Sequence, residues 1–267
     1  METRRLKNIA ILILLLLNAL LLFLMVYQNE QGRRVARDAA DELNALFAAE
    51  ELSLSEKIDP TMEPLSPLLP IRKTETSSEI AAFLLGEVIS EQSEGGGIFS
   101  YISRFGTVQF RSGGGFDTVR FVRPIEDADA FVREFCDMFG YADLSGTIAK
   151  GNGSVTAVKY IAGVPVYGCT VTLTFEGGYL TGVVGAYVDS DDAETDTREH
   201  LSCMSALIRF FDFRREEGVV CSEIKDVQCV YQLQSTGGTP QLQPLWVIET
   251  DTYSYLVDGF TGAVTRK

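Results

Sequence analysis

The chain contains a single histidine, His200, the side chain whose proton transfers are best matched to neutral pH. A Ser-His-Asp or Cys-His enzyme would need His200 as its general base. It follows Glu199 in the first turn of a predicted helix, and no GxSxG elbow or other nucleophile motif accompanies it. We therefore expect a partly exposed helix residue. The sequence predicts no catalytic residue and a protein that is not an enzyme.

Two other patterns resemble ligand-binding chemistry. The first is a run of acidic residues between 189 and 196. Hard cations such as Ca²⁺ take clustered oxygen ligands, but this acidic run lacks the spacing and central glycine of a calcium loop. We interpret the run as a solvated loop in which Asp196 and Glu199 cap the next helix. The glycines at 113–115 lack the Lys-Ser/Thr of a phosphate-binding loop, so we expect a turn. The sequence predicts no metal site and no cofactor. The acidic run comprises Asp189, Asp191, Asp192, Glu194 and Asp196.

The five cysteines are an odd number and form no CxxC pair. A zinc site would need clustered cysteine and histidine at short spacing. We interpret the cysteines as small buried apolar side chains, although a bridge between Cys221 and Cys229 across a turn stays open. They are Cys136, Cys169, Cys203, Cys221 and Cys229.

Residues 8–28 form the most apolar segment, and Asn18 is the polar residue in its middle. A transmembrane helix needs about 20 apolar residues, and basic side chains favour the cytoplasmic end. The sequence predicts a cytoplasmic tail at 1–7, a single transmembrane helix at 8–28 and the bulk of the chain outside the cytoplasm. A cleaved signal peptide and the opposite orientation are the alternatives. The basic residues before the segment are Arg4, Arg5 and Lys7.

Asn18 is the polar side chain of the predicted span. Polar residues within membranes often form hydrogen bonds across helices, although an asparagine can also be satisfied by its own helix. Spacings of three, four and seven residues define the helix face that carries it. We predict that this face binds a partner helix. Its residues are Asn18, Leu14, Leu15, Leu21, Leu22 and Met25.

The remaining sequence divides by composition. Apolar residues at helical spacing predict a juxtamembrane helix at 29–58. Four of the eight prolines lie between 59 and 70, which predicts a linker at 59–76, since proline interrupts helices. The rest, 77–267, is predicted to be one α+β domain with two or three internal repeats, at about 77–123, 124–190 and 195–267.

Each repeat is predicted to be a helix followed by three antiparallel strands, with the helices packed on the sheets. The expected helices cover 79–90, 126–139 and 197–216, and Gly140 is expected to end the second. Alternation of apolar residues and threonines through 170–175 predicts a strand with one buried and one solvated face. The fold class expected is therefore α+β, with a transmembrane helix before repeated helix-plus-three-strand units.

The charge of the chain limits its partners. It has 267 residues, 23 Lys and Arg, 37 Asp and Glu, and a formal net charge of −14. Such a surface repels nucleic acid and keeps a domain soluble, and the sequence contains no basic patch. We therefore expect no nucleic-acid partner.

Dispersed motifs resemble the YycI/YycH-type regulatory proteins of Gram-positive bacteria. The basic start and leucine-rich span are similar to theirs, as is the stretch from Glu51-Leu52-Ser53-Leu54 to Ile58-Asp59-Pro60. Two further stretches resemble PepSY-type strand pairs with a glycine turn. They are Gly163-Val164-Pro165-Val166-Tyr167-Gly168, and Leu245-Trp246-Val247-Ile248 with Asp258-Gly259-Phe260-Thr261-Gly262.

The resemblance implies a single-pass membrane protein with an extracytoplasmic domain that takes part in signal transduction. It would modulate a sensor histidine kinase of a cell-wall-related two-component system through contacts of the span and outer domain. The partners expected are that kinase, a second membrane-anchored accessory protein and the membrane itself. The alternative is a PepSY-like extracytoplasmic module that binds a ligand or inhibits a protease.

Overall fold

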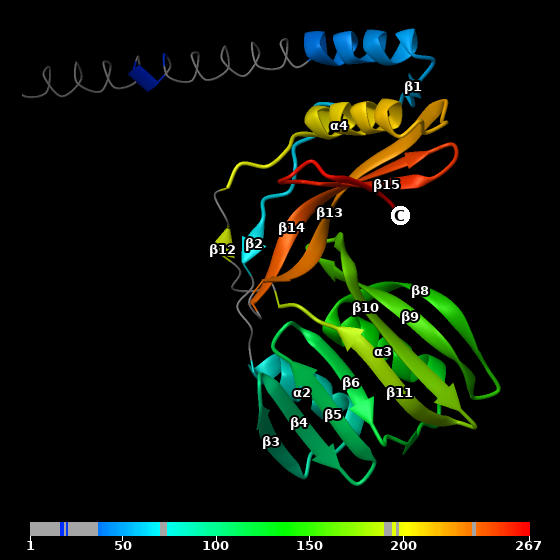
Figure 1. Ribbon diagram of the computed structural model, residues 1–267. Helices are drawn as coiled ribbons and strands as arrows, with labels where there is room; N and C mark the ends of the chain where they lie inside the picture. Colours follow the sequence, from blue (N-terminus) through cyan, green and yellow to red (C-terminus); the bar gives the residue numbers. More distant parts are fainter. Residues whose placement is uncertain are drawn as a thin grey trace, which may run out of the picture.

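The computed structural model consists of two lobes joined through one sheet (Figure 1). The central lobe contains residues 74–188, and the terminal lobe contains residues 37–69 and 198–267. The sixteen strands follow a main path of β12-β2-β14-β13-β10-β11-β6-β5-β4-β3, from which the others branch. The structure describes residues 17, 18, 20, 37–69, 74–189, 194–195, 198–236 and 239–267.

The central lobe contains two similar units, each a helix followed by a four-stranded antiparallel meander. The first unit is α2 (Thr74–Leu85), β3 (Ser90–Gly95), β4 (Ile98–Ser103), β5 (Gly106–Arg111) and β6 (Gly115–Val119). The second is α3 (Ala128–Phe139), β8 (Tyr141–Ala149), β9 (Asn152–Ile161), β10 (Val164–Glu176) and β11 (Tyr179–Ala186). The last strands of the two units, β6 and β11, pair antiparallel and join the meanders; the short β7 (Arg123–Pro124) also pairs with β11.

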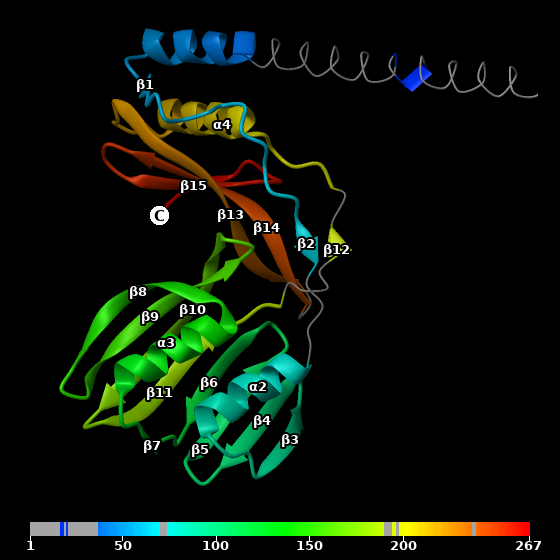
Figure 2. The same ribbon diagram turned by 180° about the vertical axis from the view of Figure 1, so that it is seen from behind.

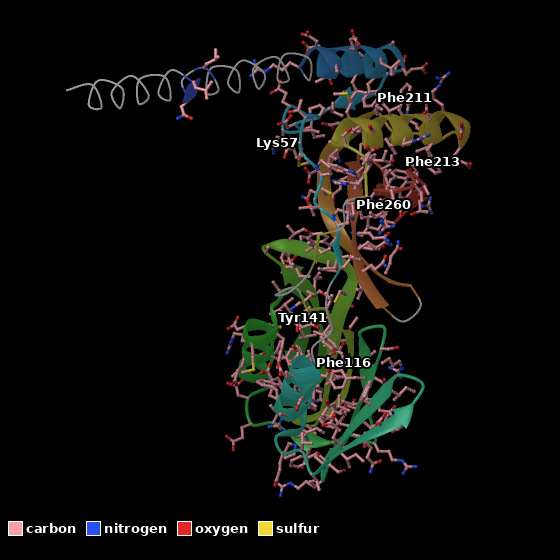
Figure 3. All side chains as sticks on the ribbon, turned by 90° about the vertical axis from the view of Figure 1, so that its left-hand side faces the viewer. Lys57, Phe116, Tyr141, Phe211, Phe213 and Phe260 are labelled. Carbon is pink, nitrogen blue, oxygen red and sulfur yellow. The ribbon has the colours of Figure 1, made fainter. Side chains whose placement is uncertain are left out.

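Both helices of the central lobe cover the same face of its sheet, and the other face has no helix on it (Figures 1 and 2). Phe83 of α2 contacts Phe131, Phe135 and Phe139 of α3, with ring centroids 4.9–5.8 Å apart. Such aromatic contacts contribute beyond their buried area, so they fix the two helices side by side. Phe116 and Tyr141 lie in this core, while Phe211 and Phe213 lie in the terminal lobe (Figure 3).

Local signals define the ends of α3. Asp127 is the N-cap, and its Oδ1 accepts a hydrogen bond from the Ala130 N–H at 2.9 Å. Gly140 ends the helix in the left-handed conformation at φ 67°, as predicted. The end of α2 is held differently, because Arg123 Nη1 donates to the carbonyls of Phe83 and Leu84 at 2.5 and 2.8 Å.

The terminal lobe has three layers: the helix at residues 37–49, then α4, then the sheet (Figure 1). The ring of Phe47 stacks on Phe211 of α4 at 5.1 Å. On the other side of α4, Trp246 is fully buried and its Nε1 donates to the Leu201 carbonyl at 3.0 Å. The elements are α4 (Cys203–Glu216), β13 (Glu223–Thr236), β14 (Thr239–Thr250), β15 (Ser254–Asp258) and β16 (Val264–Arg266).

The chain between the 37–49 helix and α2 crosses the terminal lobe as an extended strap, residues 50–69. It contributes β1 (Ser53–Leu54), which pairs parallel with β13, and β2 (Leu68–Leu69), which pairs with β14 and with β12 (Glu194–Thr195). Between them, the Tyr231 hydroxyl donates to the Ser66 carbonyl at 3.2 Å. The two lobes meet where β10 pairs parallel with β13.

The predicted fold class is wrong in two respects. Each of the helices α2, α3 and α4 is followed by four main strands and not three. In the first two units the extra strand is β3 or β8, directly after the helix, and neither has the apolar alternation that indicates a strand; in the third unit β16 forms a strand separate from β15. The units also share one continuous sheet. Helix boundaries move as well: α2 ends at Leu85, and α4 begins at Cys203 because Ser202, not Asp196, is its N-cap.

The predicted membrane location is also corrected. Within the part of the chain that the structure describes, no helix is both long and apolar enough to cross a membrane. The helices α2, α3 and α4 have 12, 12 and 14 residues, short of the roughly 20 needed. The single-pass prediction therefore has no support here. Leu14, Leu15, Leu21, Leu22 and Met25 of the predicted partner face lie outside the described residues, and Asn18 is an exposed helical residue.

Candidate functional site

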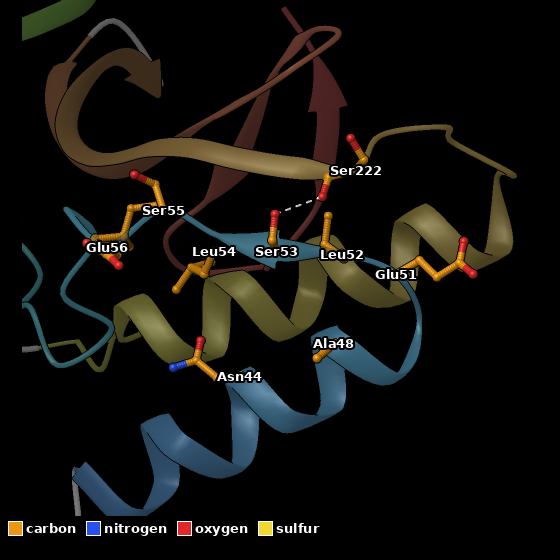
Figure 4. Close-up of a pocket in the computed structure, with 10 residues that line it drawn as sticks. Asn44, Ala48, Glu51, Leu52, Ser53, Leu54, Ser55, Glu56 and Ser222 are labelled. Carbon is orange, nitrogen blue, oxygen red and sulfur yellow. Dashed lines mark hydrogen bonds between the residues drawn. The ribbon is translucent and has the colours of Figure 1, made fainter.

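A groove of about 670 Å³ lies between the 37–49 helix and the strap, beside β1 (Figure 4). We call it the strap groove. The helix contributes the Asn44 and Ala48 side chains on the side facing β1, and Ser222 lies just before β13. Its lining consists of Asn44, Ala48, Glu51, Leu52, Ser53, Leu54, Ser55, Glu56, Ile58 and Ser222.

The helical end of the groove is closed by a Schellman motif. The Leu52 N–H donates to the Phe47 carbonyl at 3.0 Å, and the Glu51 N–H donates to the Ala48 carbonyl at 3.2 Å. This motif requires a left-handed residue, which is usually glycine, but Glu51 occupies the position at φ 56°. The left-handed backbone conformation costs a residue with a side chain about 1–2 kcal/mol of conformational free energy. The Glu51 carboxylate is therefore held at the groove at the expense of local backbone strain.

The strand side of the groove is an unpaired edge of β1. The N–H groups of Ser53 and Ser55 donate to the carbonyls of Ser222 and Ile224 at 2.9 and 3.0 Å. Successive residues of a strand direct their peptide groups to opposite sides. The N–H and C=O of Leu54 therefore point away from β13, towards the groove, and no described residue bonds to them. The groove offers one donor and one acceptor in strand geometry.

Neighbouring contacts hold this edge in place. Asp251 accepts hydrogen bonds from the Ser222 hydroxyl at 2.6 Å and from its N–H at 3.1 Å, and the hydroxyl bond is the main cause of a lowered Asp251 pKa. Arg214 of α4 donates to the carbonyls of Glu50 and Cys221 at 3.4 and 3.1 Å. It thereby ties the end of the 37–49 helix, 164 residues before it in the sequence, to the start of β13.

The electrostatic character of the groove is acidic. Glu51 and Glu56 are its charged residues, and no Lys, Arg, His or Cys is among the described lining residues. The serine hydroxyls, the Asn44 amide and the Leu54 peptide groups add hydrogen-bonding capacity. This set can bind and orient an extended chain that carries positive charge.

A second hollow of about 370 Å³ lies where α2, the end of α3 and β9 meet. Several of its polar groups form hydrogen bonds within the protein. Thr76 Oγ1 donates to Asp189 Oδ2 at 2.6 Å, and Lys159 Nζ donates to the Phe139 carbonyl at 2.5 Å, at the C-terminal end of α3. These bonds attach the helices to the sheet, so we interpret the second hollow as structural.

The chemically suggestive residues of the sequence do not assemble into a site. His200 lies at the surface, with its Nδ1 3.2 Å from the Arg198 carbonyl. Asp189, at the start of the acidic run, accepts the Thr76 bond; Asp191, Asp192 and Asp196 lie outside the described residues. No group of three or more His, Cys, Asp or Glu with metal-binding geometry occurs among the residues described.

All five cysteines are free, so the open alternative of a bridge between Cys221 and Cys229 is not realised. Four are buried and Cys229 is half-buried, as their interpretation as small apolar side chains predicted. Burial raises the pKa of Cys169 and Cys203 to about 12, and that of Cys136 and Cys229 to about 11. The thiols therefore stay protonated at neutral pH and are weak nucleophiles.

Sequence reasoning missed the strap groove. All of its lining residues except Ser222 lie within 29–58, for which the sequence predicts one juxtamembrane helix. A usable signal was the alternation of Leu52, Ser53, Leu54 and Ser55, which is typical of a strand with one buried face. The run is too short to indicate a strand by itself, and its partner β13 begins 170 residues after β1 does.

Comparison with known proteins adds little to this geometry. No protein-family model matches the chain, and no curated protein matches it either. The resemblance to the YycI/YycH family therefore has no support from these comparisons. Two solved structures are similar at low identity, and with TM-scores below 0.5 neither assigns a family or a function.

One is an uncharacterized protein from Eubacterium rectale, at 11% identity and a TM-score of 0.45, covering 81% of this chain and 90% of that one. The other is the YpeB C-terminal domain from Bacillus megaterium, at 12% identity and a TM-score of 0.33, covering 74% of this chain and 98% of that one.

Proposed function

We propose that this protein is a non-enzymatic interaction module that binds an extended polypeptide segment in the strap groove. The observation that carries the proposal is the unpaired edge at Leu54, which faces a groove of peptide-sized volume. A segment laid beside β1 would add a strand to the sheet, a mode in which main-chain hydrogen bonds supply affinity. The 37–49 helix would cover its other side.

The chemistry of the lining favours a cationic segment. Glu51 and Glu56 are the charged residues that line the groove, so lysine or arginine side chains would meet complementary charge. Charge complementarity of this kind steers association and selects partners, and salt weakens it. We therefore expect tighter binding of a basic extended peptide than of an acidic one, with the difference shrinking at high salt.

We also propose a source for this segment: the sensor histidine kinase, or the accessory protein, that the sequence resemblance implies. The resemblance alone supports this finer proposal. The alternative, a PepSY-like module that binds another ligand or inhibits a protease, would use the same groove with a different polypeptide. A photo-crosslinker placed at Asn44 in the full chain distinguishes the two by the protein that it captures.

The decisive test compares two variants at one position. Leu54→Pro removes the N–H that faces the groove, while the bonds of Ser53 and Ser55 to β13 are retained, and proline is tolerated on a strand edge. Leu54→Ala removes the same side chain but keeps the N–H. The probe is a fluorescent octapeptide of alternating lysine and valine, with a glutamate and valine octapeptide as its charge control.

We expect the proline variant to bind the lysine peptide about three- to tenfold more weakly than the alanine variant, the effect of one lost hydrogen bond. Fluorescence anisotropy measures the affinities, and the fluorescence of Trp246 checks that the terminal lobe is folded. Equal affinities in the two variants would refute strand addition at β1. Equal affinity for the two peptides would refute the cationic ligand.

A further inference from the structure

The edges of the central sheet differ in how well they are protected against pairing with another chain. The edge strand β3 is polar, and both Glu91 and Glu94 are exposed. Such charges are a common device against edge-to-edge association. At the opposite edge, β8 has nine residues, and the six from Leu144 to Ala149 carry no charge. Leu144 is 51% exposed. A bulge interrupts the pairing of β8 between Ala142 and Ser145, but from Ser145 to Ala149 the register is regular and the edge is uncharged.

The peptide groups that β8 presents to solvent follow from its hairpin with β9. Lys150 and Gly151, at φ 53° and 73°, form a two-residue turn of the type that matches strand twist. Ala149 and Asn152 flank this turn, and hydrogen-bonded pairs alternate along an antiparallel ladder. Gly146 and Ile148 therefore direct their N–H and C=O outward. No described residue bonds to these groups.

We propose that β8 pairs antiparallel with β8 of a second copy of this chain, about a two-fold axis through Thr147. In this register Thr147 faces itself, and Gly146 exchanges both of its outward hydrogen bonds with Ile148 of the second copy. A threonine pair directly across an antiparallel ladder is favourable. The pairing would extend the central sheet from one copy into the next.

The charges at the two ends of β8 favour a copy of this chain over another partner. Asp143 lies at one end of the strand and Lys150 follows the other, and both are exposed. An antiparallel copy brings Lys150 of each chain close to Asp143 of the other, so both charges gain an opposite neighbour. The formal net charge of −14 disfavours contact elsewhere, whereas the residues between these two are uncharged.

The register is testable by disulfide capture. Residues facing each other in a non-hydrogen-bonded antiparallel pair have Cα atoms about 4.5 Å apart, within the range that a disulfide spans. Thr147→Cys in the full chain should therefore form a covalent dimer under mild oxidation. Ser145→Cys places its two thiols about 14 Å apart and should not, at a rise of about 3.4 Å per residue. Mixing Ser145→Cys with Ala149→Cys should restore the cross-link.

Charge variants give an independent readout by light scattering. We expect wild-type protein to be dimeric at about 100 μM and Thr147→Asp to raise its dissociation constant about tenfold, because like charges then face each other. Mixing Thr147→Asp with Thr147→Lys should recover the dimer, while Ser93→Asp on β3 should leave it unchanged. The proposal would be overturned by a monomeric wild type, or by equal disulfide capture of Thr147→Cys and Ser145→Cys. It would also be overturned if the mixture of Thr147→Asp and Thr147→Lys were no more dimeric than Thr147→Asp alone.

Discussion

Replacement of Phe47 by alanine tests whether the 37–49 helix is an integral layer of the terminal lobe. The Phe47 side chain is fully buried and stacks on Phe211 of α4 at 5.1 Å. Removal of a buried phenylalanine costs about 3–5 kcal/mol, which includes the loss of the stacked pair. Leu46, the preceding residue, is 45% exposed, so Leu46→Ala should change the free energy of unfolding by less than about 0.5 kcal/mol.

The single tryptophan makes the measurement specific to the lobe. Trp246 is fully buried on the other side of α4, so its fluorescence reports unfolding of the terminal lobe in urea. With a slope of roughly 2 kcal/mol per M, Phe47→Ala should lower the midpoint by about 1.5–2.5 M. If Phe47→Ala and Leu46→Ala gave the same small shift, the helix would be a spacer and its packing on α4 would be unimportant for stability.

Two further predictions concern ionisable groups of the protein. The bonds from Ser222 lower the pKa of Asp251 below its usual 3.8, so this carboxylate stabilises the fold above about pH 4, and that contribution is lost as the pH falls through the lowered value. Asp251→Asn should therefore unfold at lower urea than wild type at pH 6, with the difference shrinking as the pH falls below 3.8, when Trp246 fluorescence is followed. Burial raises the thiol pKa values, so native protein at pH 8 should react slowly with iodoacetamide. Cys229, the half-buried one, should react first, and mass spectrometry after denaturation should find five alkylated thiols. Rapid labelling of Cys203 in the native state would contradict the buried position assigned to it.

Local features of the structure could be predicted from the sequence because they depend on neighbouring residues. Gly140 ends α3 since a left-handed cap needs a residue without a side chain. The alternation through 170–175 produces a strand whose Val171, Leu173 and Phe175 are buried while the threonines between them are not. The side chain alternation of a strand is a property of the backbone, so it is visible in the order of residues.

The arrangement of the units depends on contacts between residues far apart in the chain. Nothing in the local pattern of β6 or β10 specifies pairing with β11 of the other unit or with β13 of the terminal lobe. The strap groove exists because the 37–49 helix packs on α4 and β1 pairs with a strand 170 positions later along the register. Hydrophobic burial is non-directional, so the apolar face of that helix indicates that it must be covered but not by which element. The residue pattern determined most of the helices, strands and turns; tertiary packing decided the remaining strands, such as β1, and which edges are paired and which, at Leu54 and along β8, are left open.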